Sequence, residues 1–183
     1  MKNKYKILLI LAPAIFLLDQ FTKYLVLQHI GFGDAIPIIP GYFDLVHVRN
    51  TGAAFGLLSS LGDSLRNPLF YGISAIAIFV LSSLFKNLDE INRFFPVLLS
   101  LIFGGVLGNL TDRIRFGNVV DFLSFHIQDK TLWGISLEWP SFNVADSAIT
   151  VSMIFLAIHF LRDQGPASPD REANSQSLRS PKE

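Results

Sequence analysis

The chain has 183 residues, of which 50% are hydrophobic and only 16% are charged, and its formal net charge is zero. Soluble domains usually carry about 25% charged residues, so the composition argues against a soluble domain and indicates a membrane protein. Balanced charge gives no reason to expect nucleic acid as a partner. The absence of cysteine excludes disulfides, a thiol nucleophile and thiolate metal ligands.

Four segments are long and apolar enough to cross, or nearly cross, a bilayer, because a spanning helix needs about 20 mostly apolar residues. They cover residues 7–27, 69–85, 94–110 and 144–161. The first contains Ala12-Pro13-Ala14, which imitates a signal-peptide cleavage site after a lysine-rich start. The apolar pattern continues beyond this site to Leu27, so we interpret the segment as a retained helix.

An ionisable pair lies within this first helix. Asp19 and Lys23 are four residues apart and therefore share one helix face. Placing such a charge at the centre of a spanning helix costs at least ~2.5 kcal/mol, so each needs a reason. For Lys23 we favour a structural ion pair or a side chain that reaches the interface. Asp19 is the better candidate for the bundle interior.

The connection 28–68 shows alternating apolar and polar residues from Phe43 to Arg49, after clusters of Gly and Pro. This pattern predicts a small strand-bearing subdomain that rests on the membrane. In the same connection, residues 31–34 (Gly-Phe-Gly-Asp) resemble a motif of one class of intramembrane aspartyl peptidase, with residues 42–44 as a second element. That class carries these motifs within helices, so we interpret residues 31–34 as a turn.

Polar residues gather at the end of the third span. Gly104 and Gly108 form a small-xxx-small face suited to close helix packing. Asn109 then shares one side of the last turn with Asp112 or Arg113. Arg113 could position a carbonyl or pair with a carboxylate. The alternative is an ordinary helix end at the interface.

Two further aspartates follow. Asp121 stands alone between apolar residues, and Asp146 is the third helical residue of the fourth span if Asn143 caps that helix. Capping alone is an alternative role for Asp146, although a capping box usually has Glu or Gln there. We favour a functional role because Asp19 and Arg113 are expected at the same membrane depth as these two aspartates.

Lys and Arg flank the spans on one side, at positions 2, 4 and 6, at Lys86 and Arg93, and in the tail. Cytoplasmic segments carry this excess, so both termini are expected to be cytoplasmic, with connections 28–68 and 111–143 outside. We expect one membrane domain over residues 1–163. Residues 164–183, rich in Pro, Ser, Arg and Glu, are expected to form a disordered cytoplasmic tail.

Two carboxyls about 3 Å apart would share one proton, because both cannot ionise readily, and so supply an acid and a base. The base would activate a water molecule against a peptide carbonyl, and the acid would polarise that carbonyl. Arg113 and Asn50 are candidate donors to the oxyanion. Which aspartate is the base stays open, since the proton belongs to the pair.

Other chemistries fit less well. There is no His-Glu-x-x-His string and no Gly-x-Ser-x-Gly elbow, so neither a metal site nor a cofactor is predicted. A Ser-Lys dyad with Lys23 lacks a convincing serine. A transporter or channel could use Asp19, Asp112 and Asp146 as an ion path, but the chain has no inverted repeat. A non-catalytic membrane scaffold is the remaining alternative.

Five strings, in this order, resemble the bacterial lipoprotein signal peptidases, or signal peptidase II. They are Asp19-Gln20 with Lys23, residues 50–56, residues 105–109 with Asp112-Arg113, residues 119–122, and residues 142–146. The resemblance covers roughly residues 5–161 and implies an all-α membrane fold, with four transmembrane helices and a strand-bearing extracytoplasmic subdomain in the first outer loop. It implies Asp121 and Asp146 as the catalytic dyad. The implied site-lining residues are Asp19, Asn50, Asn109, Asp112, Arg113 and Asn143.

The same resemblance implies an aspartic endopeptidase of the bacterial cytoplasmic (inner) membrane, with its site at the extracytoplasmic face. Such enzymes remove signal peptides from prolipoproteins, cutting before a cysteine that carries a diacylglyceryl group. Membrane lipid and globomycin, a cyclic peptide inhibitor, are the other implied partners. A lipid-anchored cysteine would hold the scissile bond near the membrane surface, within reach of a dyad at helix ends.

Overall fold

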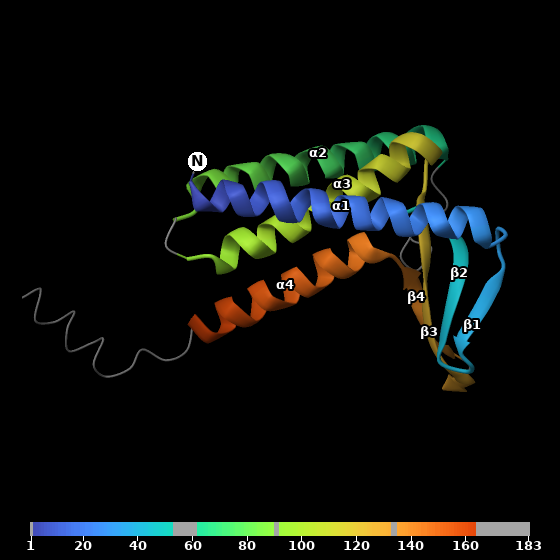
Figure 1. Ribbon diagram of the computed structural model, residues 1–183. Coiled ribbons are helices and arrows are strands. Elements are labelled where there is room, and N and C mark those ends of the chain that lie inside the picture. The colour runs from blue at the N-terminus through green and yellow to red at the C-terminus, as the bar shows by residue number, and fades with distance from the viewer. Residues whose placement is uncertain (1, 53–61, 90–91, 133–134, 164–183) are drawn as a thin grey trace, which may run out of the picture.

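A computed structural model describes residues 2–52, 62–89, 92–132 and 135–163, which form four long helices and four strands (Figure 1). The helices are α1 (Asn3–His29), α2 (Asp63–Asn87), α3 (Phe94–Phe116) and α4 (Val144–Asp163). Each is long and apolar enough to cross a membrane. The four predicted spans are therefore confirmed as helices. The predicted tail, residues 164–183, lies outside the described residues.

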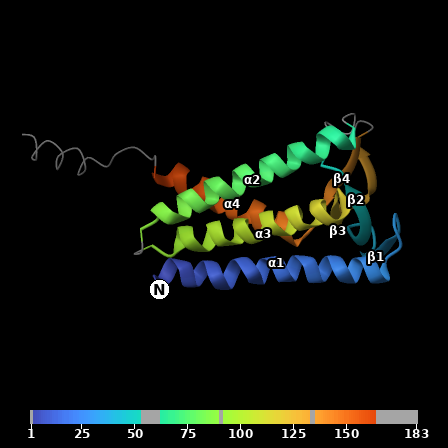
Figure 2. The same cartoon turned by 90° about the horizontal axis from the view of Figure 1, so that it is seen from above.

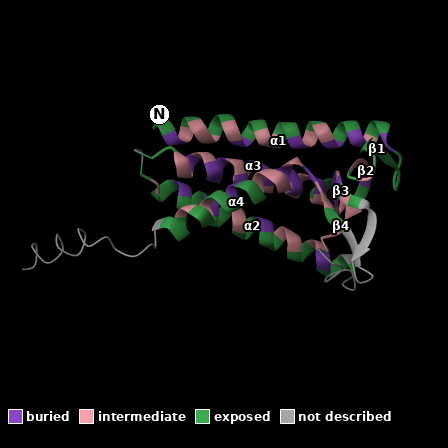
Figure 3. Ribbon diagram, turned by 90° about the horizontal axis from the view of Figure 1, so that it is seen from below, coloured by how far each residue is buried: buried purple, intermediate pink, exposed green. Residues whose placement is uncertain are grey.

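The helices run side by side, with α3 packed against each of the other three (Figures 1 and 2). Half of the most hydrophobic part of α3 is buried inside the bundle, whereas only 11% to 17% of the corresponding parts of α1, α2 and α4 are buried (Figure 3). Large apolar side chains such as Phe79 and Leu161 are each 74% exposed. Outward-facing side chains of this kind suit contact with lipid, so α3 forms the centre of a membrane bundle.

The strands form one antiparallel sheet in the order β1-β2-β3-β4 at one end of the bundle (Figure 1). The strands are β1 (Ala35–Ile39), β2 (Phe43–Asn50), β3 (Val119–Leu132) and β4 (Ile135–Phe142). The N-terminus and the last turn of α4 lie at the opposite end (Figure 1). The sheet runs across the ends of the helices (Figure 1).

The strand-bearing subdomain expected in the first loop is only half of the sheet, because β1 and β2 come from that loop and β3 and β4 come from the second connection. A hairpin of β1 and β2 alone would be marginally stable, and further strands make such a sheet independently stable. The start of β3 lacks strict alternation of apolar and polar residues, which hid it in the sequence. The turn predicted at residues 31–34 is confirmed: the Asp34 amide donates to the Gly31 carbonyl at 3.0 Å.

Glycines let α3 approach both of its neighbours. A Cβ atom on Gly104 would lie 2.6 Å from the Ala12 carbonyl oxygen of α1, and one on Gly105 would lie 2.7 Å from the Ala145 carbonyl oxygen of α4. Both distances are too short for a real Cβ contact. The predicted small-residue packing face is therefore confirmed, and it sets the spacing between the helices that carry the polar residues.

Gly104→Ala is expected to lower the unfolding free energy by about 1–3 kcal/mol, because the new methyl group must push apart two backbones that are already in contact. Gly72→Ala is the matched control, since a Cβ on Gly72 meets nothing within 4 Å and Ala favours the helix. Denaturant unfolding in detergent micelles measures both. Equal stability of the two variants would contradict the close packing of α1 on α3.

Candidate active site

Asp121 and Asp146 come from two elements that the sheet brings together. Asp121 lies in β3, opposite Val48 of β2. The next strand, β4, pairs antiparallel with β3 and places Phe142 opposite Leu123. Because α4 begins directly after β4, its first turn reaches the start of β3, where the Asp121 side chain is only 1% exposed.

Asn143 connects the two carboxyls. Its Nδ2 donates to Asp121 Oδ1 at 2.7 Å, and its backbone N–H donates to Asp146 Oδ2 at 3.3 Å. Its Oδ1 accepts the backbone N–H of Asp146 at 2.9 Å. The reciprocal bonds form a capping box with Asp in place of Glu or Gln. The capping role of Asp146 is therefore real, and it fixes the carboxyl beside Asp121.

Two more amides hold the outer oxygens of the pair. Asn50 Nδ2 donates to Asp121 Oδ2 at 2.9 Å, and Asn109 Nδ2 donates to Asp146 Oδ1 at 2.7 Å. Asn50 is itself fixed, since its Oδ1 accepts the Gly52 amide at 2.7 Å. Each carboxyl thus accepts hydrogen bonds from two neutral donors.

Burial raises the pKa of Asp121 from 3.8 to about 7, and the nearby charge of Asp146 contributes to the same increase. The hydrogen bonds from Asn50 and Asn143 act in the opposite direction because they favour the ionised form. A carboxyl with a pKa near 7 is protonated in about half of the molecules at neutral pH. The site can therefore hold a proton under conditions in which an ordinary aspartate would have lost it.

A buried lysine lies next to this pair. Lys23 Nζ is 2.8 Å from Asp19 Oδ2 and 2.9 Å from Asp112 Oδ2, and it donates to Asn109 Oδ1 at 3.0 Å. The Lys23 side chain is 2% exposed, and those of its two acidic partners are 0% and 1% exposed. The ammonium group lies between the two carboxylates. Among the described residues, no group of three His, Asp or Glu side chains could hold a metal.

The acids of this cluster also position the catalytic candidates. Asp19 Oδ1 accepts the Ala145 amide in the first turn of α4 at 3.0 Å. Asp112 Oδ2 accepts the amide of Val120, the residue before Asp121, at 3.1 Å. Salt bridges, amides and backbone bonds thus tie α1, α3, β3 and α4 together at one point.

Arg113 lies near the site but turns toward α2. Its guanidinium carbon is 4.7 Å from the centre of the Phe70 ring, and its Nη1 makes a long 3.4 Å bond to the Asn109 carbonyl. The nearby carboxyls that act on its charge belong to Asp146, Asp121 and Asp112. The structure therefore brings all eight predicted residues to one region, with Arg113 at its edge.

Sequence reasoning missed the contacts that two residues of α1 make with α3. The ion pair of Asp19 and Lys23 was predicted and is confirmed, but Lys23 also reaches α3. Gln20 does so as well, with Nε2 donating to Asp112 Oδ1 at 2.9 Å. These contacts require a close approach of α1 and α3 at Gly108, where a Cβ would lie 2.5 Å from Asp19 Oδ2. The combination of this glycine with a charged pair in a neighbouring span was the available signal.

Comparison with solved structures first indicates the class of protein, a membrane enzyme. Two solved structures described as bacterial membrane enzymes are similar to this one. One has a TM-score of 0.72 and 33% identity, covering 88% of this chain and 92% of the other. The second has a TM-score of 0.70 and 34% identity, covering 86% and 94%.

The family follows from the sequence. A family model described as signal peptidase (SPase) II matches residues 11–162. A lipoprotein signal peptidase of Geobacter metallireducens is 39% identical over 93% of this chain and 99% of its own length, and one of Staphylococcus haemolyticus is 38% identical over 89% and 97%. The chain belongs to the signal peptidase II family. It is thus an aspartic peptidase with four apolar helices.

Proposed function

We propose that this protein is an endopeptidase of the bacterial inner membrane that removes signal peptides from diacylglyceryl-modified prolipoproteins, cutting before the modified cysteine. Asp121 and Asp146 are the catalytic dyad of this proposal. The observation that carries it is Asn143, which hydrogen-bonds to both buried carboxyls and so holds them side by side. Membership of the signal peptidase II family supplies the class of substrate.

In the proposed reaction the pair shares one proton. The ionised carboxyl removes a proton from water while the water oxygen attacks the scissile carbonyl carbon, and the protonated carboxyl donates a hydrogen bond to the carbonyl oxygen. The resulting tetrahedral intermediate collapses when the leaving amine nitrogen receives a proton from the pair and the C–N bond breaks. The pair has taken one proton from water and given one to the amine, so it again holds a single proton. No cofactor is consumed.

The neighbouring groups take different parts in this reaction. Asn50 already donates to Asp121, so we assign it to orienting that carboxyl. Arg113, at the edge of the site, is the candidate donor to the oxyanion. Asn109 transmits the charge of Lys23, because its Oδ1 accepts from the ammonium while its Nδ2 donates to Asp146.

An ion-coupled transporter fits the same residues less well. A path for cations or protons through Asp19 and Asp112 would need these carboxylates to be accessible. Lys23 fills the space between them, with both contacts below 3 Å. A charge held in this way neutralises the acids and supports a structural role for the cluster.

A cleavage assay tests the proposed function. The purified protein in lipid vesicles is given a prolipoprotein with a diacylglyceryl cysteine, and the products are weighed by mass spectrometry. We expect a new N-terminus at the modified cysteine, slower cleavage of the unmodified substrate, and inhibition by globomycin. Absence of cleavage, or a cut elsewhere, would refute the assignment.

Membrane orientation is proposed from the distribution of Lys and Arg, with the sheet outside and both termini in the cytoplasm. The native chain contains no cysteine, so single cysteines are clean reporters. Phe32→Cys, at a side chain 73% exposed beside the sheet, should react with an impermeant thiol reagent added outside cells. Asp89→Cys should react only after lysis. The reverse pattern would invert the orientation.

A further inference from the structure

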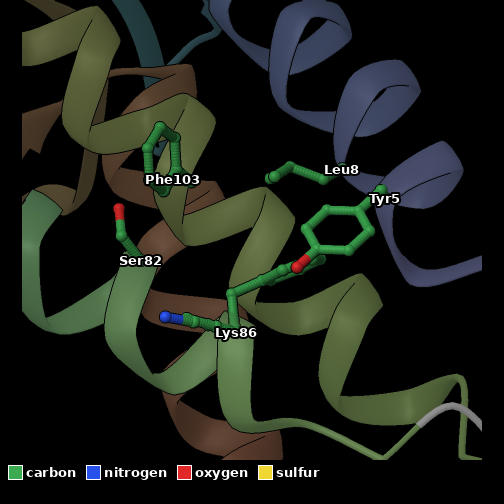
Figure 4. A pocket seen from close by; sticks show the side chains of 6 residues that line it. Tyr5, Leu8, Ser82, Lys86 and Phe103 are labelled. Atoms are coloured by element: carbon green, nitrogen blue, oxygen red, sulfur yellow. The ribbon is translucent and has the colours of Figure 1, made fainter. Parts of the chain in front are cut away.

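A groove runs along the bundle from the end away from the dyad to Leu107, which lies two residues before Asn109. Its two parts, of about 220 Å³ and 290 Å³, share Leu8 and Phe103 and so adjoin. Figure 4 shows the first part, where Tyr5 and Leu8 of α1, Ser82 and Lys86 of α2, and Phe103 of α3 surround the space. The second part is lined by apolar residues only: Leu8, Leu9, Ala12, Pro13, Phe16, Phe103 and Leu107.

The length of the groove matches one leaflet of a bilayer. Along α1 it extends from Tyr5 to Phe16, which is roughly 16 Å at a rise of about 1.5 Å per residue. Half of a hydrocarbon core about 30 Å thick is about 15 Å. A signal-peptide helix would need the whole thickness, whereas a single acyl chain needs one half.

The groove has a cationic end and an apolar end. Lys86 lies at the end near the chain's N-terminus, and its side chain is exposed. Lys4 Nζ donates to the carbonyls of Lys86 and Leu88 at 2.8 and 2.6 Å. Lys4 thereby ties the start of α1 to the end of α2 and satisfies the last carbonyls of that helix. At the start of α1 and around the end of α2, the described charged side chains are Lys2, Lys4, Lys6, Lys86 and Asp89.

We propose that this groove binds an anionic phospholipid of the leaflet opposite the dyad, with one acyl chain along α1 and the phosphate beside Lys86. The positive charge of Lys86 favours an anionic headgroup. The length of the groove matches that of one acyl chain. Tyr5 supplies an amphipathic ring at the depth of the headgroups, where such rings are enriched. The lipid fills the space between α1 and α2 next to Phe103, and its contacts hold the two helices against α3.

Native mass spectrometry of the full chain released from micelles tests this site, with phosphatidylglycerol and phosphatidylcholine of identical chains as probes. We expect one lipid to bind, with phosphatidylglycerol about fivefold tighter, as one lysine near an anionic surface contributes about 1 kcal/mol. Lys86→Gln should weaken phosphatidylglycerol binding about fivefold and phosphatidylcholine binding less, because the choline cation of phosphatidylcholine offsets the charge of its phosphate. Equal affinities in the native protein, or an unchanged preference in Lys86→Gln, would overturn the proposal.

A matched pair of variants locates the acyl chain. Ser82 lines the groove, and its hydroxyl donates to the Ile78 carbonyl of its own helix at 2.7 Å. Ser82→Leu should fill the groove and weaken both lipids, whereas Ser83→Leu, at the exposed neighbouring position, should not. Identical lipid binding by these two variants would refute the site. Displacement of the lipid by prolipoprotein, or its replacement by a second copy of the chain, would assign the groove to that occupant instead.

Discussion

Asp121→Asn and Asp146→Asn are each expected to slow signal-peptide release by about 10²–10⁴-fold or more, the usual contribution of a positioned acid or base. Asparagine keeps the shape of aspartate but cannot exchange the shared proton. The double variant should be no slower than the slower single variant, because residues that act as one unit have non-additive effects. The measurement is turnover of modified prolipoprotein by purified protein.

Asp44→Asn is the control for these two variants. Asp44 also lies in the sheet, with Oδ2 3.3 Å from His126, but it is not a member of the dyad and should leave turnover near normal. Thermal unfolding of each variant separates a loss of chemistry from a loss of fold. Normal turnover by either dyad variant would eliminate that residue from the mechanism.

Lys23→Met is expected to lower the unfolding free energy by about 3–5 kcal/mol, the usual cost of removing one partner from a buried ion pair. Methionine retains much of the length of lysine but leaves Asp19 and Asp112 buried without their cation. Lys6→Met is the matched control, since Lys6 lies on the same helix and is exposed. Denaturant unfolding in micelles compares the two variants.

A neutral version of the cluster sharpens this test. Adding Asp19→Asn and Asp112→Asn to Lys23→Met removes the stranded charges, and replacing an entire buried ionic group is often tolerated. We expect the triple variant to recover part of the lost stability. If Lys23→Met were as stable as Lys6→Met, the ammonium would have no part in holding α1 to α3.

Hydropathy predicted the helices because a bilayer demands about 20 apolar residues in sequence, and that signal is local. The sheet was harder to predict. Its first hairpin showed alternation near Phe43, whereas β3 begins with Val119, Val120 and Asp121, which are all buried. The pairing of β3 with β2 is a contact between distant segments, and no local pattern encodes it.

The gathering of four residues, Asp19, Arg113, Asp121 and Asp146, was predicted from their expected membrane depth, and the structure places them in one region. Their catalytic and binding roles remain predictions. The contribution of Lys23 was underestimated because its partners are on another helix: an i,i+4 pair with Asp19 was visible, but the bond to Asn109 was not. Likewise the capping alternative for Asp146 proved compatible with a place beside Asp121, because the two oxygens of one carboxyl serve different neighbours.

The pH dependence of kcat/KM tests the shared proton most directly. With the pKa of Asp121 raised to about 7 by burial and by the charge of Asp146, the pair keeps its proton below that pH and loses it above. Activity should therefore fall above about pH 7. Asn50→Ala removes a hydrogen bond that lowers this pKa, so the decline should move to higher pH, while Asn118→Ala should leave it in place. Activity that stays constant up to pH 9, or a decline that Asn50→Ala does not move, would contradict a dyad that works with one shared proton.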